Sequence, residues 1–175
     1  MASNANEFSI FLEACERDIF SFCKYLTMGK GDADELYQDT VLAAFLAMDK
    51  IDITHNPKAY VYSIAVGKWK NATRKAARRN AIAPAINEEA LLYVPGSDNV
   101  EAAAEAAALK QTLATAIKGI DDKHRIPLIL HYFDDCSTEE IANICNIPKG
   151  TVKSRLHKGR ELLRKALAKE GYDGT

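Results

Sequence analysis

The segment spanning residues 137–165 constrains the fold most, because it carries in close succession the signals for a short helix, a turn and a second helix. Ser137 and Glu140 have the spacing of a capping box, in which each side chain accepts a hydrogen bond from the other residue's backbone amide. The sequence Asn146-Ile147-Pro148 predicts a turn, with proline placed to start the next helix. We therefore expect a helix-turn-helix.

The second helix of this segment is strongly cationic. In a helix-turn-helix the second helix enters the major groove of DNA, and its opposite side packs on the first helix. Val152 and Leu156 have the spacing for that packing, and Gly159, unfavourable in a helix by about 1 kcal/mol, predicts that a neighbouring element approaches closely. Lysine and arginine neutralise phosphates, and Lys153 or Arg155 has the reach for a guanine edge. The residues expected to contact DNA are Lys149, Thr151, Lys153, Ser154, Arg155, Lys158 and Arg160.

Charge is distributed unevenly along the chain. The formal net charge of the 175 residues is only -1, yet acidic residues dominate residues 7–39, and residues 68–79 are basic without a single carboxylate. Local charge, rather than net charge, decides which surface attracts a polyanion. The sequence therefore predicts a second basic surface, separate from the helix-turn-helix. For each charge run taken alone, a solvated helix face is the alternative.

The amino-terminal part reads as a series of amphipathic helices. Apolar residues recur at steps of three and four between Phe8 and Leu26, which predicts a first helix. Asp32 with Glu35 predicts the start of a second helix, and Asn56-Pro57 predicts the start of a third. The apolar stripe expected on the second helix consists of Leu36, Val41, Ala44, Phe45 and Met48. No segment reads as a strand, so we expect an all-helical fold.

A change of composition divides the chain. The stretch AIAPAINEEALLYVPGSDN contains two prolines and has no clean period, which is typical of a linker. We expect two small helical domains, at residues 1–80 and 106–175, joined by a linker at residues 81–105. Asp98 with Glu101 predicts a further helix start, and helix is expected to continue over residues 121–133, with a later start or a kink because of Pro127.

Three motifs resemble those of bacterial RNA polymerase sigma factors of the extracytoplasmic-function (ECF) group. The sequence CSTEEIANICNIPKGTVKSRLHKGRELLRKAL resembles the family's carboxyl-terminal promoter-binding domain. Upstream, DADELYQDTVLAAF resembles the polymerase-binding helix, and NPKAYVYSIAVGKWKNATRKAARR resembles the helix that engages the minus-10 element. The resemblance covers residues 7–167. It implies a transcription initiation factor that binds core RNA polymerase, directs it to specific promoters and assists promoter melting.

The resemblance also assigns residues to partners. The implied partners in core polymerase are the clamp helices of its largest subunit and other core subunits. The residues implied to bind the clamp helices are Asp34, Glu35, Gln38 and Asp39. The set implied to bind the minus-10 element is Lys68, Lys70, Asn71, Arg74, Lys75, Arg78 and Arg79, and the DNA set of the helix-turn-helix would bind the minus-35 element. Val66 and Gly67 depart from the arginine and asparagine common in the family. An anti-sigma factor is a further implied partner.

Other features bear on function classes outside DNA binding. The 4 histidines and 4 cysteines fall in no nucleophile motif and have no metal-ligand spacing, so we expect no catalysis, no cofactor and no metal. Trp69, Tyr60 and Tyr62 are expected in the core rather than stacked on bases. No apolar run is long enough to cross a bilayer, which predicts a cytoplasmic protein. The alternatives are a helix-turn-helix regulator that does not bind core polymerase, and a helical adaptor that binds protein alone.

Overall fold

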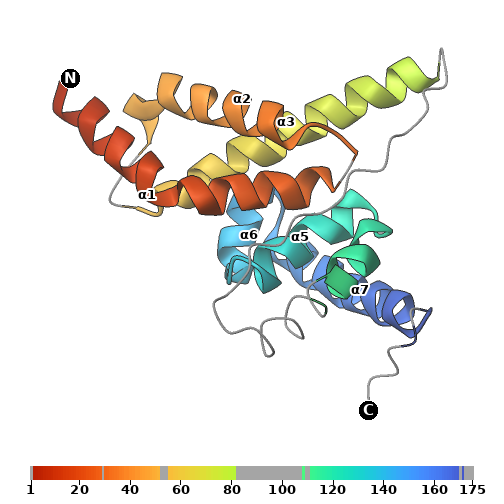
Figure 1. Cartoon of the computed structure of the whole chain (residues 1–175). Helices are drawn as coiled ribbons and strands as arrows, with labels where there is room; N and C mark the ends of the chain where they lie inside the picture. Colours follow the sequence, from red (N-terminus) through yellow and green to blue (C-terminus); the bar gives the residue numbers. More distant parts are fainter. Residues whose placement is uncertain are drawn as a thin grey trace. The chain divides into compact units, whose positions relative to one another are not determined.

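The computed structural model describes residues 2–28, 30–51, 55–81, 108, 111–169 and 171, and all their regular structure is helical. The elements are α1 (Ala2–Thr27), α2 (Ala33–Leu46), a 3-10 turn η1 (Met48–Lys50), α3 (Pro57–Asn80), α5 (Asp122–Tyr132), α6 (Thr138–Cys145) and α7 (Lys149–Lys169) (Figure 1). A further helix covers residues 111–118. They form two compact helical units, as expected. The predicted linker and the Asp98–Glu101 capping pair lie outside the described residues, so the domain boundaries stay predictions.

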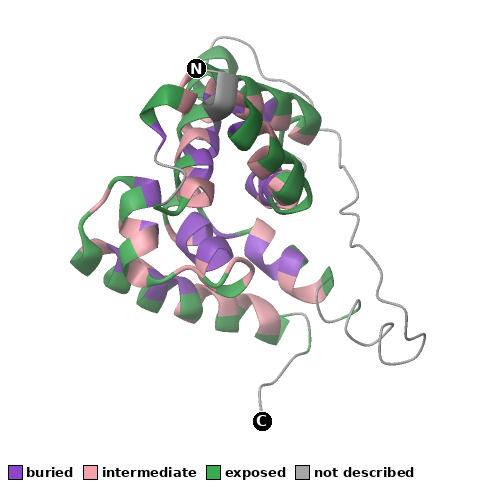
Figure 2. Cartoon of the chain, turned by 90° about the vertical axis from the view of Figure 1, so that its left-hand side faces the viewer, coloured by how far each residue is buried: buried purple, intermediate pink, exposed green. Residues whose placement is uncertain are grey.

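The amino-terminal unit is a bundle in which α1, α2 and α3 pack on one another. Its core contains Phe8, Ile19, Phe22 and Leu26 from α1. Buried and exposed residues alternate along the helices (Figure 2). The rings of Phe22 and Tyr62 stack with centroids 4.2 Å apart and join α1 to α3. Such a pair adds roughly 0.5–1.5 kcal/mol to the stabilisation from buried area.

The helices of this unit begin where the capping residues predict. The Asp32 side chain accepts hydrogen bonds from the backbone N–H of Asp34 at 2.9 Å and of Glu35 at 3.1 Å. The Asn56 side chain accepts one from Ala59 N–H at 3.1 Å, and Pro57 follows as the first helical residue. These bonds satisfy amides that lack an intrahelical partner, a contribution of about 1 kcal/mol per cap.

The buried face of α2 differs in part from the predicted stripe. Leu36 and Ala44 are buried as expected, but Phe45 is 40% exposed, so its assignment to the buried stripe is wrong. Thr40 is fully buried instead, and its hydroxyl donates to the carbonyl oxygen of Leu36 at 2.6 Å. A threonine fits this core because the hydrogen bond to its own helix satisfies the hydroxyl.

The carboxyl-terminal unit combines helix 111–118 with α5, α7 and residues 138–142 of α6. Ile117, Leu128, Ile141 and Val152 are among its buried core residues. The predicted single helical stretch is interrupted, because Gly119 lies in a turn after the first of these helices and Asp121 is the N-cap of α5.

Helix α5 begins at Asp122 and continues through Pro127, so the expected later start is wrong. An internal proline costs about 3 kcal/mol through a lost hydrogen bond and a steric clash. Ile126, Leu128, Ile129 and Leu130 surround it in the sequence and are all buried. Burying such a side chain contributes about 1.5–3 kcal/mol, and the packing of α5 therefore offsets the cost of the proline.

The cysteines are free, and their burial differs. Cys23 and Cys145 are buried, as small apolar residues would be, and Cys15 and Cys136 are half-buried. Burial raises the pKa of the Cys23 thiol to about 12, despite the opposing hydrogen bond with Thr40. A thiol with so high a pKa stays protonated at neutral pH and is a poor nucleophile.

Within the described residues, every helix is too short or too polar to span a bilayer.

Candidate nucleic-acid interface

The predicted polymerase-binding residues share the first two turns of α2. Asp34, Glu35, Gln38 and Asp39 are all exposed, whereas Leu36 and Thr40 between them face the core. The N-cap bonds from Asp32 fix this first turn, and the carboxylates lie where the helix dipole favours negative charge. The structure therefore brings the predicted set together on one accessible, acidic helix face.

An apolar surface continues from this acidic face and was missed by the sequence reasoning. Leu42 is 59% exposed and Leu46 is 79% exposed, and they follow Gln38 at steps of four along α2. The step of four was the signal available in the sequence, since it places these leucines on the face of Gln38 rather than on that of Leu36. Exposed apolar residues next to charged ones are typical of protein interfaces.

The basic segment of α3 lies on its carboxyl-terminal half. Lys68, Asn71, Arg74, Lys75, Arg78 and Arg79 are exposed, and Lys70 is half-buried. Trp69 is only 4% exposed and Tyr62 is buried, whereas Tyr60 is 36% exposed, so the expectation of a core role is confirmed for Trp69 and Tyr62 and is wrong for Tyr60. Val66 is buried and Gly67 is exposed, so neither of these two positions exposes a side chain to a ligand.

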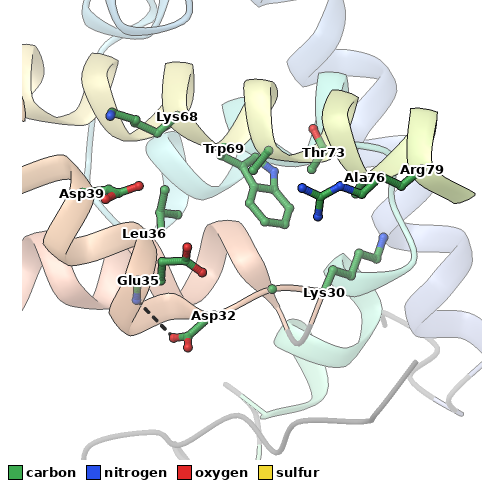
Figure 3. Close-up of a pocket in the computed structure, with 12 residues that line it drawn as sticks. Lys30, Asp32, Glu35, Leu36, Asp39, Lys68, Trp69, Thr73, Ala76 and Arg79 are labelled. Atoms are coloured by element: carbon green, nitrogen blue, oxygen red, sulfur yellow. Dashed lines mark hydrogen bonds between the residues drawn. The ribbon is translucent and has the colours of Figure 1, made fainter. Parts of the chain in front are cut away.

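A cavity of about 380 Å³ lies between the start of α2 and α3, within the amino-terminal unit (Figure 3). Trp69 points from α3 toward α2, and a Cβ atom at Gly31 would approach Trp69 Cζ3 to 3.1 Å, so glycine permits the close turn before α2. Asp39 and Lys68 lie at one end, and Lys30 and Arg79 lie at the other. Two members of each predicted set therefore line a common cavity: Glu35 and Asp39 of the polymerase-binding set, and Lys68 and Arg79 of the minus-10 set.

Helices α6 and α7 form the predicted helix-turn-helix. Ser137 N–H donates to Glu140 Oε2 at 2.8 Å, and Glu140 N–H donates to Ser137 Oγ at 3.2 Å, which is the full capping box. Asn146 adopts a left-handed backbone with φ 53, a conformation that asparagine tolerates better than most residues. Val152 and Leu156 are buried, as predicted for the packing side of α7.

The predicted minus-35 residues lie on the other side of α7. Lys149, Lys153, Ser154, Lys158 and Arg160 are exposed, and Thr151 and Arg155 are half-buried. Lys149 Nζ lies 3.3 Å from Glu139, and Lys158 Nζ lies 2.9 Å from Glu161. The bond from Lys158 and its charge lower the pKa of the Glu161 carboxyl, although Glu161 reaches solvent. Exposed pairs of this kind contribute little to stability, so a phosphate can replace the carboxylate.

Tyr132 is a second feature that the sequence reasoning missed. It ends α5, is 51% exposed, and its hydroxyl oxygen accepts a hydrogen bond from Arg160 Nε at 2.9 Å. The only sequence signal was a polar-tipped aromatic residue after the buried run of α5, which does not specify a partner.

Each of the two units matches the model of a known protein family. Residues 11–79 match the model of Sigma-70 region 2, and residues 110–163 match that of Sigma-70, region 4. The chain is 30% identical over 165 residues to the ECF RNA polymerase sigma factor SigW of Bacillus subtilis, covering 91% of this chain and 88% of that protein. The chain belongs to the ECF RNA polymerase sigma factors. Its function is that of a transcription initiation factor.

Other sigma factors show the same likeness. The ECF RNA polymerase sigma-E factor of Escherichia coli is 29% identical over 141 residues, which cover 76% of this chain and 72% of that factor. The fold matches the sigma factor RpoE of Bartonella quintana, solved in complex with the anti-sigma factor NepR, with a TM-score of 0.77 and 23% identity. That match covers 92% of this sigma factor and 96% of the solved chain.

Proposed function

We propose that this ECF sigma factor binds core RNA polymerase through α2, the minus-10 element through α3 and the minus-35 element through α7. Residues 1–80 would act as region 2 and residues 106–175 as region 4, with residues 81–105 as the linker. The residues would be the sets given above: Asp34 to Asp39 for polymerase, Lys68 to Arg79 for the minus-10 element and Lys149 to Arg160 for the minus-35 element.

The observation that carries this proposal is the division of α7 into two sides. Val152 and Leu156 are buried against the unit, while Lys153, Ser154 and Lys158 are exposed from the first turns onward. A helix held in this way presents its amino-terminal turns to base edges and its cations to phosphates. The basic face of α3 gives the second DNA contact that a simple helix-turn-helix regulator would not need.

The geometry of α3 bears on promoter melting. Strand opening requires that a base be unstacked and held while cations guide the backbone. The cations that would guide the DNA backbone are the exposed residues Arg74, Arg78 and Arg79. Because Val66 is buried and Gly67 has no side chain, neither side chain reads a base, and base selection at the minus-10 element falls to other residues of the unit.

We further propose that an anti-sigma factor regulates this chain and that the chain acts in the cytoplasm. RpoE was solved with an anti-sigma factor, and the exposed Leu42 and Leu46 next to the acidic face of α2 give such a partner an apolar surface to cover. The initiation factor would act in the cytoplasm, where polymerase and DNA are, and would perform no catalysis of its own.

Run-off transcription tests the function. Purified bacterial core polymerase is incubated with fragmented source-genome DNA, with and without this chain. We expect discrete transcripts that require the chain, and these give its promoters directly. If no transcript depends on the chain and it does not co-elute with core polymerase, a helix-turn-helix regulator that does not bind polymerase is the better assignment.

Reversal of one charge tests the polymerase-binding face. We expect Asp39→Lys to weaken binding to core polymerase by about tenfold or more, because a basic partner surface would then face a like charge. Glu13→Lys, an exposed change of the same size on α1, is the matched control. Fluorescence anisotropy of the labelled chain titrated with core polymerase measures both, and equal affinities would move the docking site away from α2.

A further inference from the structure

Tyr132 is the one residue outside α7 whose side chain is hydrogen-bonded to Arg160 in the described part of the structure. Arg160 Nε–H donates to its hydroxyl oxygen at 2.9 Å. A guanidinium carries five N–H donors in a rigid plane, so this bond uses one donor and fixes the direction of the others.

The close packing of α5 and α7 explains how Tyr132 reaches this place. A Cβ atom at position 159 would lie 3.0 Å from Cγ and Cδ1 of Leu128, so the absence of a side chain at Gly159 lets the two helices approach. Tyr132 lies one turn beyond Leu128 on the same face of α5, and Arg160 directly follows Gly159. The glycine therefore brings the tyrosine hydroxyl within reach of the arginine.

The neighbouring ring limits the freedom of Tyr132. The His131 ring packs edge-on against Tyr132 with centroids 4.9 Å apart, and His131 Nδ1 lies 3.2 Å from the carbonyl oxygen of Cys136. The contact with His131 therefore restricts the position of the Tyr132 hydroxyl, although about half of the Tyr132 residue is exposed.

The chemistry of the acceptor separates Arg160 from other cations of α7. Lys149 and Lys158 face the carboxylates of Glu139 and Glu161, which partly cancel their charges. A tyrosine hydroxyl is neutral, so it orients the guanidinium without reducing its charge. A planar donor fork that is already oriented and fully charged is suited to a phosphate group.

We propose that Tyr132 is a positioning residue of the DNA-binding face, which holds the Arg160 guanidinium ready for a phosphate of the promoter backbone. The inference rests on the proposed function of α7 and adds α5 to the machinery that binds the minus-35 element. It predicts an effect on affinity that is independent of base sequence, because phosphates carry no sequence information.

A double-mutant cycle tests the proposal on the holoenzyme formed by core polymerase and the full chain. The probe is a fluorescein-labelled duplex carrying a promoter that the wild-type holoenzyme transcribes. We expect Tyr132→Phe, which removes only the hydroxyl, to weaken binding about threefold to tenfold. In an Arg160→Ala background the same change should have no further effect, since the group that it positions is gone.

Controls separate this role from the alternatives. In an Arg164→Ala background, with an exposed arginine of α7 removed instead, Tyr132→Phe should keep its full effect. Additive losses with Arg160→Ala, tighter binding by Tyr132→Phe, or a lower melting temperature without a change in affinity would each overturn the proposal. Lys153→Ala reports on α7 itself: if it and Arg160→Ala both leave affinity unchanged, α7 does not bind DNA and the proposed function fails first.

Discussion

Gly159 shows how a single residue is chosen by packing against its intrinsic preference. Glycine in a helix interior is less favourable than alanine by about 1 kcal/mol, which should make alanine the better residue in α7. At this position, however, the added methyl group would meet the fully buried Leu128 at 3.0 Å. A buried leucine cannot give way without disturbing its own neighbours.

We expect Gly159→Ala to lower the free energy of unfolding of the carboxyl-terminal unit by about 1 kcal/mol, because overpacking by about 1–3 kcal/mol exceeds the gain in propensity. Gly67→Ala is the matched control, since nothing lies within 4 Å of a Cβ atom there. That change should stabilise the amino-terminal unit by about 0.5–1 kcal/mol. Urea denaturation followed by Trp69 fluorescence and by circular dichroism distinguishes the units, and the same sign at both sites would contradict this account.

At the scale of the element, α2 and α7 each have a buried side that packs in the core and an exposed side that is proposed to bind a partner. Helix α2 buries Leu36 and Thr40 and exposes the acidic set, and α7 buries Val152 and Leu156 and exposes the cations. The buried side fixes the rotation of the helix about its axis, and that rotation decides which residues reach a partner. A helix of the same composition without this buried stripe would present no defined face.

The position of Arg155 on α7 predicts a base contact. It lies in the second turn of the helix and is half-buried, close to the side of the first turns that is proposed to face the groove. We expect Arg155→Ala to weaken binding to the specific promoter by about 1–3 kcal/mol, with a much smaller loss on scrambled DNA. Lys158→Ala should instead weaken both equally and lower the slope of log K against log salt by about 1. Equal losses on both DNAs for Arg155→Ala would make it a phosphate contact.

At the scale of the whole molecule, the two proposed DNA contacts would gain in affinity from lying on one chain. Once one unit is bound, the other experiences a high effective concentration of its own site, provided that both sites are within reach. The family models place region 2 at residues 11–79 and region 4 at residues 110–163, so both contacts belong to the same chain. Affinity should therefore depend on the spacing of the two promoter elements.

We expect insertion of about 5 base pairs between the elements, half a turn of B-DNA, to reduce holoenzyme binding and transcription by at least tenfold. Insertion of a full turn of DNA would return the two promoter elements to the same face of the duplex. The elements would still be farther apart than in the original promoter, so binding would recover only in part. Run-off transcription and filter binding on the two templates measure this. A response indifferent to spacing would mean that one unit alone selects the promoter.

The sequence by itself determined where most helices begin and which motifs they carry. Asp32, Asn56 and the pair Ser137–Glu140 cap the helices that they predict, because capping depends on a few adjacent residues. The helix-turn-helix and its basic face follow from the same local signals. The site sets stay predictions, and all their members are exposed except Lys70, Thr151 and Arg155, which are half-buried.

Tertiary structure alone decided which side chains are covered and which meet. Phe45 is exposed and Thr40 buried, Pro127 stays inside α5, and Tyr132 reaches Arg160, a residue 28 positions away in the sequence. Each outcome depends on surfaces supplied by residues distant in the chain, and local propensity contains no information about them. Short-range hydrogen bonds determine where the helices form along the chain. Only packing between helices determines which residues of different helices contact one another.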